Sequence, residues 1–171
     1  FRTKLDVMKP DTVLLLATAN AVKTAHFFTL YLERLNGNNK KTRVITAESL
    51  TAGLIMSTLV DIPNQGWSKY GCFGVYNTSA KEKFLGVRVR KEEWSNVDPE
   101  NTVYTHRCAA QMAIGALINS NNNEKGTIGG DTASFAISVT GQAMPWKMSE
   151  HTLGKVHIGF AVYVDEQFKP V

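Results

Sequence analysis

The stretch Arg43–Gly53 constrains the fold most strongly, because it changes from strand-like to helix-like residues within a few positions. A short β-branched run is followed by a hydroxyl, a carboxylate and small residues, and residues 51–60 then have helical character. This order predicts a strand, a turn and a helix, with Ser49 at the mouth of the turn. The first N–H groups of a helix have no partner inside it, so such a turn can bind an oxyanion or a phosphate.

Strand-like and helix-like segments alternate along the rest of the chain. We expect strands at 43–47, 70–76, 133–140 and 155–164, and helices at 21–35, 51–60 and 79–85. A further helix would open at Asp98-Pro99-Glu100 and carry on one face the residues Ala109, Met112, Ala113, Ala116 and Leu117. The alternation predicts the α/β class, a layered α/β/α sandwich around a mainly parallel or mixed sheet. The length of 171 residues fits a single domain over residues 1–171.

Composition excludes several classes of protein. A hydrophobic fraction of 43% and a charged fraction of 20% are ordinary for a soluble globular domain. The net charge of +4 fits an anionic ligand or scattered lysines, and without an arginine-rich stripe we expect no nucleic acid partner. Cys72 and Cys108 have no CxxC spacing, which favours buried thiols in a reducing, cytoplasmic compartment. The four histidines lack compact ligand spacing, so no metal site is expected.

The first 20 residues superficially resemble a secretory leader, with basic residues, a short apolar run and an A-x-A end. Pro10 and Asp11 interrupt that pattern, which favours a strand or a helix start inside the domain. No apolar run approaches the about 20 residues of a membrane-spanning helix, so no membrane partner is expected.

Polar or small residues follow three of the expected strands, at 46–49, 75–78 and 139–141. Ligands bind at the carboxyl ends of parallel strands in open α/β sheets, so these ends would form one site if the strands run parallel.

A serine at that site needs a base to become a nucleophile, and the chain has neither a G-x-S-x-G elbow nor an evident His–Asp pair. A lysine can act as the base when burial lowers its pKa. The residues alone leave two interpretations open: Ser49, Tyr76 and Lys81 are catalytic, or they are a helix cap, a packing tyrosine and a surface lysine.

A set of ordered motifs resembles the CinA C-terminal domain family, the nicotinamide mononucleotide amidases, over residues 20–165. The motifs are Thr46-Ala47-Glu48-Ser49-Leu50-Thr51-Ala52-Gly53, Tyr76-Asn77-Thr78-Ser79-Ala80-Lys81, Phe84-Leu85-Gly86-Val87, Ser138-Val139-Thr140-Gly141 and Leu153-Gly154-Lys155-Val156. The resemblance implies a hydrolase of NAD salvage that converts this pyridine nucleotide to nicotinate mononucleotide and ammonia. It implies a nucleotide as the small-molecule partner, a homo-oligomer and no cofactor.

The resemblance also implies the roles of individual residues. Ser49 would attack the carboxamide, Lys81 would accept its proton directly or through Tyr76, and Tyr76 would orient the pair. N–H groups around residues 51–53 would stabilise the oxyanion, and N–H groups near 140–141 or at another helix end would hold the phosphate. Glu48 would contact the ribose or the pyridinium, or would instead stabilise the helix dipole. The expected substrate-binding residues are Glu48, Thr51, Ala52, Gly53, Asn77, Thr140 and Gly141.

Several positions depart from the family's pattern. Ala52 and Met144 replace glycines, Lys155 replaces a threonine, and Tyr104-Thr105-His106 replaces the V-S-E element. These changes leave two alternatives open: a diverged amidase for another small carboxamide, and a non-catalytic nucleotide-binding or regulatory module. Lys155 is either a phosphate contact or a solvated lysine. His157, on the same strand face, either lines the pocket or is structural.

Overall fold

The computed structural model describes residues 10–35, 42–88, 103–121, 132–142 and 154–163. Its sheet has the order β2-β1-β3-β4, in which β1 runs parallel to β2 and β3, and β4 runs antiparallel to β3. The expected α/β fold with a mixed sheet is confirmed. The elements are α2 (Pro10–Leu35), β1 (Val44–Glu48), α3 (Leu54–Val60), the 3-10 helix η1 (Gly66–Ser68), β2 (Lys69–Gly74), α4 (Thr78–Leu85), α5 (His106–Asn121), β3 (Phe135–Gly141) and β4 (Val156–Val162).

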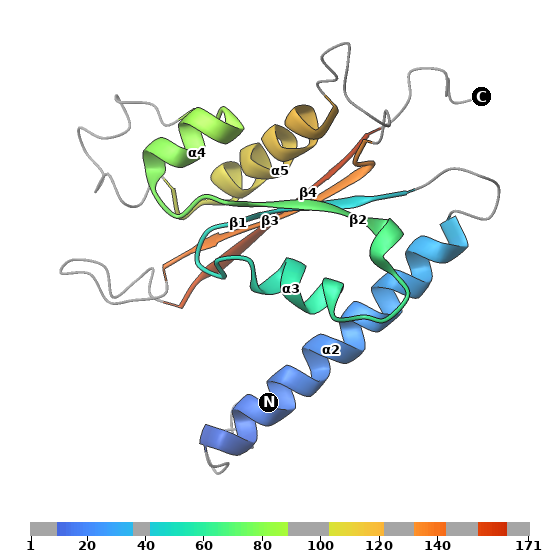
Figure 1. Ribbon diagram of the computed structural model, residues 1–171. Coiled ribbons are helices and arrows are strands. Elements are labelled where there is room, and N and C mark those ends of the chain that lie inside the picture. The colour runs from blue at the N-terminus through green and yellow to red at the C-terminus, as the bar shows by residue number, and fades with distance from the viewer. Residues whose placement is uncertain (1–9, 36–41, 89–102, 122–131, 143–153, 164–171) are drawn as a thin grey trace, which may run out of the picture.

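The helices lie on both faces of the sheet: α4 and α5 on one, α2 and α3 on the other (Figure 1). Every residue of β1 is buried, because it is a central strand covered on both sides. Ile45 and Ala47 pack in the cluster that includes α5, whereas Val44 packs with Leu32 of α2 and Leu59 of α3. The alternation of side chains along β1 thus divides the core into two layers.

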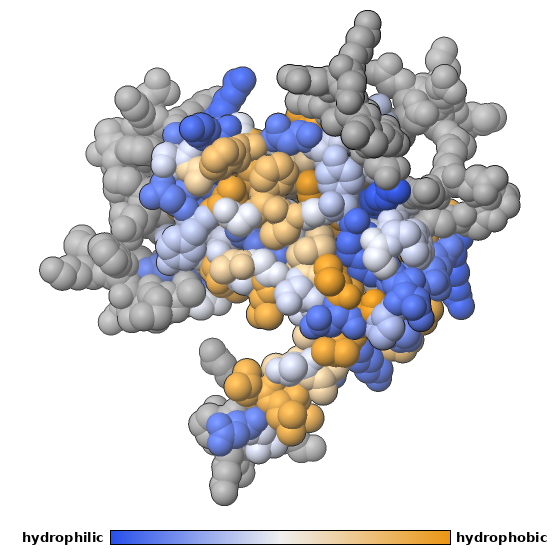
Figure 2. All heavy atoms as spheres, in the orientation of Figure 1, coloured by the Kyte–Doolittle hydropathy of each residue, from blue (hydrophilic) through white to orange (hydrophobic). Residues whose placement is uncertain are grey.

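Helix α2 begins eleven residues earlier than the sequence predicts, at Pro10 rather than residue 21. The segment that resembles a leader is therefore helical where the structure describes it. Ala25 and Leu32 are buried, but Leu14 and Leu15 remain 68% and 69% exposed. This end of α2 extends beyond the sheet as an apolar projection (Figures 1 and 2). No helix among the described residues is both long and apolar enough to cross a bilayer.

Two other helices begin later than predicted. Helix α3 begins at Leu54 because Ala52 (φ 50°) and Gly53 (φ 100°) lie in the left-handed region, which a right-handed helix cannot contain. Helix α5 begins at His106, and residues 103–105 form a turn and bends instead of continuing a helix from Pro99. Thr105 Oγ1 accepts from the N–H of Cys108 at 3.1 Å and so caps this helix. Residues 98–100 lie outside the described part of the chain.

Candidate active site

Ser49 lies where the carboxyl ends of the three parallel strands meet, as the sequence predicts. Its N–H donates to the Val139 carbonyl of β3 at 3.0 Å. On the other side of β1, the N–H of Val75 donates to the Glu48 carbonyl at 2.8 Å. The backbone around Ser49 is therefore held from both neighbouring segments.

Lys81 lies one turn inside α4, and its amine reaches Ser49. Asn77 caps the N-terminus of this helix, since its side-chain oxygen accepts from the N–H of Ser79 at 2.8 Å. The Lys81 side chain is only 1% exposed. Its Nζ lies 3.0 Å from Ser49 Oγ and donates to the Tyr76 carbonyl at 2.9 Å. The interpretation of Lys81 as a surface lysine is wrong, because α4 directs this side chain into the core.

Burial lowers the pKa of Lys81 below its usual 10.5, and the charge interaction with Cys108, which raises this pKa, is the smaller effect. Both hydrogen-bond partners of the amine are uncharged oxygens. Burial also raises the pKa of Cys108 to about 11, which keeps that thiol protonated near neutral pH. The surroundings thus favour a neutral amine, the form that can accept a proton.

Tyr76 contributes its backbone to this pair. Its carbonyl orients the Lys81 amine, while the side chain is 74% exposed. The contact between Lys81 and Ser49 is therefore direct, and Tyr76 contacts the Lys81 amine through its main-chain oxygen.

The carboxylate of Glu48 lies beneath the turn on the opposite face of the sheet. It is fully buried and accepts five hydrogen bonds of 2.8–3.0 Å. Burial alone would raise the pKa of Glu48, but the hydrogen bonds, led by that of Met56, lower it overall. This position matches the helix-dipole alternative from the sequence. The donors are the hydroxyls of Thr46 and Thr51 and the N–H groups of Gly53, Ile55 and Met56.

The N–H groups of the turn are partly occupied by the chain itself. The N–H of Ala52 donates to the Ser49 carbonyl at 3.2 Å, and the N–H of Gly53 donates to Glu48. Within the described segments, the N–H groups of Leu50 and Thr51 donate to no acceptor. Of the donors expected at residues 51–53, Thr51 is thus available and Ala52 and Gly53 are occupied, and Leu50 is an available donor that the sequence did not indicate.

The other expected binding residues are distributed around this centre. Asn77 caps α4, the Thr140 hydroxyl donates to the Val103 carbonyl at 2.8 Å, and Gly141 pairs with Val156. The structure brings Ser49 and Lys81 together and places Thr140 one strand away.

Cys108 is buried, as the cysteine pattern predicts. The sequence did not indicate that this residue of α5 lies close enough to Lys81 to influence its pKa. Cys72, expected to be buried, is exposed because β2 is an edge strand. Among the described residues, no group of three or more His, Cys, Asp or Glu side chains could hold a metal ion.

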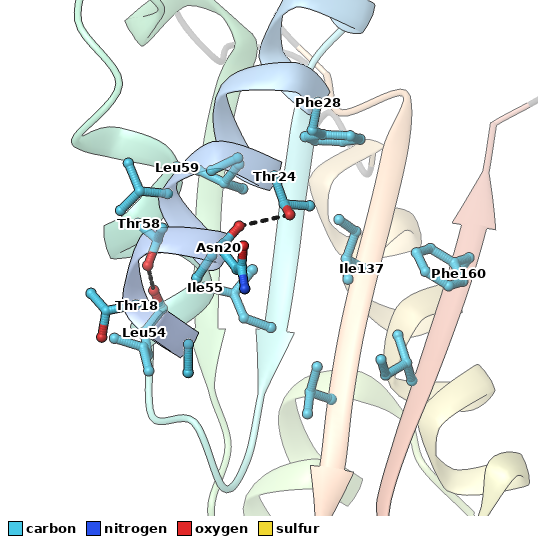
Figure 3. A pocket seen from close by; sticks show the side chains of 16 residues that line it. Thr18, Asn20, Thr24, Phe28, Leu54, Ile55, Thr58, Leu59, Ile137 and Phe160 are labelled. Carbon is cyan, nitrogen blue, oxygen red and sulfur yellow. Dashed lines mark hydrogen bonds between the residues drawn. The ribbon is translucent and has the colours of Figure 1, made fainter. Parts of the chain in front are cut away.

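A cavity of about 670 Å³ lies on the other face of the sheet, between α2, α3, β3 and β4 (Figure 3). Side chains such as Phe28, Leu54, Ile137 and Phe160 make its lining largely apolar. Ser49 and Lys81 do not line it, so the cavity is separate from the candidate active site.

The fold and this pair define the class of protein: a small α/β domain with a serine and a buried lysine at the strand ends. The model of the CinA C-terminal domain matches residues 30–169, and the chain belongs to that family. A competence-damage inducible protein of Streptococcus thermophilus is 32% identical over 118 residues, which are 69% of this chain and 24% of that protein. A CinA-like protein of Chlorobium phaeobacteroides is 37% identical over 122 residues, 69% of this chain and 24% of that protein. The chain thus spans about a quarter of the length of these curated relatives.

Solved structures agree with this assignment. The competence/damage inducible protein CihA of Agrobacterium tumefaciens superposes with a TM-score of 0.64 at 29% identity, covering 83% of this chain and 73% of that one. A competence or damage-inducible protein of Enterobacter asburiae, 18% identical, has a TM-score of 0.59 over 85% of this chain and 84% of that one. The second likeness supports the fold alone.

Proposed function

We propose that this chain is a nicotinamide-nucleotide amidase, which hydrolyses the carboxamide of nicotinamide mononucleotide to nicotinate mononucleotide and ammonia. The observation that carries the proposal is the 3.0 Å contact between Lys81 Nζ and Ser49 Oγ in the protein interior. Membership of the CinA family supports the choice of substrate. Two free thiols, Cys72 and Cys108, support a reducing compartment such as the cytoplasm.

The geometry suggests how the first step would proceed. A neutral Lys81 has two N–H donors and one lone pair. One N–H is held by the Tyr76 carbonyl, which leaves the lone pair free to take the Ser49 proton. Ser49 Oγ would then bond to the carboxamide carbon. The C–N bond would break as Lys81 returns the proton to the departing ammonia, and water would then hydrolyse the Ser49 ester to release nicotinate mononucleotide.

The negative oxygen formed during this attack needs hydrogen-bond donors. We assign this role to the N–H groups of Leu50 and Thr51, because the next two along the turn are occupied. A single donor of this kind stabilises a transition state by about 3 kcal/mol. Glu48 would act by holding the turn in place from below.

The proposal is tested by incubating the purified chain with nicotinamide mononucleotide while ammonia and nicotinate mononucleotide are measured. Lys81→Met keeps the buried volume and removes the amine, and Lys83→Met is its matched control on the exposed face of α4. We expect turnover in the parent chain and in K83M, and none in K81M. Full turnover in K81M would contradict the mechanism. A folded parent chain that releases ammonia only from other carboxamides would favour the diverged amidase.

A further inference from the structure

A row of residues crosses the sheet from Ser49 to the edge strand. Ser49 bonds to Val139 and so lies beside Thr140, and Thr140 pairs with His157 on β4. Neighbouring strands are about 4.8 Å apart, so the backbone of His157 is about 10 Å from that of Ser49. A mononucleotide spans a comparable distance between its base and its phosphate.

His157 lies on the same face of the sheet as the Ser49–Lys81 pair. Thr140 directs its hydroxyl to Val103, just before α5, and residues directly opposite each other in an antiparallel pair share a face. Gly159, two residues along β4, faces the Ala109 carbonyl of α5 so closely that a Cβ there would collide with it. His157 therefore points toward α5.

Helix α5 places a second histidine against His157. His106 is the first residue of this helix, and its Nδ1 lies 3.3 Å from the Nδ1 of His157. The two rings are nearly perpendicular, at 87°, with their centres 4.5 Å apart. Polar nitrogens from both rings are thus gathered at the end of the row.

The charge around this pair is positive. Burial, then His106, then Lys155 lower the pKa of His157, and the Tyr104 carbonyl opposes them. Lys155 is exposed and directly precedes β4, two residues before His157. The three surrounding elements, α5, β3 and β4, contain no acidic residue within their bounds. The elements that surround His106, His157 and Lys155 therefore supply no negative side chain to this cluster. Such surroundings favour the binding of an anion.

We propose that His106, His157 and Lys155 bind the phosphate monoester of the substrate whose carboxamide lies at Ser49. This inference rests on the proposed function, and it assigns the phosphate to side chains rather than to the backbone near Gly141. A phosphate dianion would neutralise the cluster and accept hydrogen bonds from the imidazoles and the ammonium.

The test uses binding rather than turnover. Inorganic phosphate is titrated into the intact chain at neutral pH while the imidazole NMR signals are followed. We expect saturable shifts of His106 and His157, a rise in the pKa of His157 and no response from His26 on α2. His157→Gln and Lys155→Thr should each weaken phosphate about tenfold or more, whereas His26→Gln and Lys23→Thr should not.

A second arm identifies the source of the phosphate. In the Ser49→Ala variant, nicotinamide mononucleotide should bind about tenfold or more tightly than nicotinamide riboside, and K155T should remove that difference. An absence of saturable phosphate binding, or unchanged affinity in both H157Q and K155T, would overturn the site. A chain that binds phosphate here but releases no ammonia would refute the amidase and leave the anion site standing.

Discussion

The amine of Lys81 lies 3.0 Å from the hydroxyl of Ser49, a residue 32 positions earlier in the chain, and both side chains are buried. Burial disfavours the charged form of the lysine and brings the candidate base against the candidate nucleophile. The same packing thus accounts both for the position of the amine and for its lowered pKa.

Replacing Ser49 by alanine should abolish ammonia release from nicotinamide mononucleotide, by about a thousandfold or more, because the nucleophile is lost. Ammonia production and the thermal unfolding midpoint should be measured together. Ser57→Ala, on an exposed position of α3, is the matched control and should retain full activity. Undiminished turnover in S49A would exclude Ser49 as the nucleophile.

The rate should rise with pH as Lys81 loses its proton, since only the neutral amine can act as the base. The rise in rate should occur at a pH below the usual lysine pKa of 10.5, because burial lowers the pKa of this amine. Measurement of kcat/KM against pH reports this group in the free enzyme. A profile that stays flat up to pH 10 would contradict the assignment.

The same shift predicts a dependence of stability on pH. Between the lowered pKa and 10.5, the unfolded chain holds a proton on Lys81 that the folded chain lacks. The contribution of Lys81 to the free energy of unfolding therefore rises with pH across that window. Urea unfolding at several pH values should show this slope in the parent chain and lose it in K81M.

Glu48→Gln should destabilise the fold by about 3 kcal/mol, because one oxygen becomes an amide donor facing N–H and O–H donors. Glu82→Gln, at an exposed position of α4, should be nearly neutral. Since the folded-state pKa of Glu48 is lowered, its stabilising contribution should be present above pH 4.5 and lost as pH falls through the folded value. Equal unfolding midpoints for E48Q and E82Q would refute this role.

Ala52→Gly should stabilise the protein by about 1 kcal/mol, because Ala52 has a φ of 50° and glycine adopts that conformation without a steric penalty. Ala110→Gly, on the exposed side of α5, should instead destabilise it by about 1 kcal/mol. Thermal unfolding of the two variants would show opposite signs if the backbone conformation decides the effect.

We expect the chain to associate with a second copy through its exposed apolar surface, since large patches of this kind mark interfaces. Leu15 on α2 is 69% exposed and Phe160 on β4 is 62% exposed. Figure 2 shows apolar residues at the projecting end of α2. Light scattering after gel filtration should give an oligomer for the parent chain and for Ile114→Asp, and a monomer for the Leu15→Asp, Phe160→Asp double variant. A monomeric parent chain would contradict this expectation.

Local patterns were sufficient to predict the strands, since alternation and β-branching define them within a few residues. Helix starts were less predictable, because they depend on backbone conformation and caps. Ala52 and Gly53 delay α3 through positive φ angles, and Thr105 caps α5 where the sequence suggested an earlier start. The long α2 has few buried contacts in its first half, so no apolar stripe could reveal it.

The order of residues alone determines that a strand ends just before Ser49, that Ser49 opens a turn, and that polar residues follow three strands. Those features depend on interactions within a few positions. Tertiary structure alone decides that Lys81 is buried against Ser49, that Tyr76 contributes a carbonyl, and that His106 meets His157. Each of these depends on how helices α4 and α5 pack on the sheet, and burial then sets the protonation of the groups they bring together.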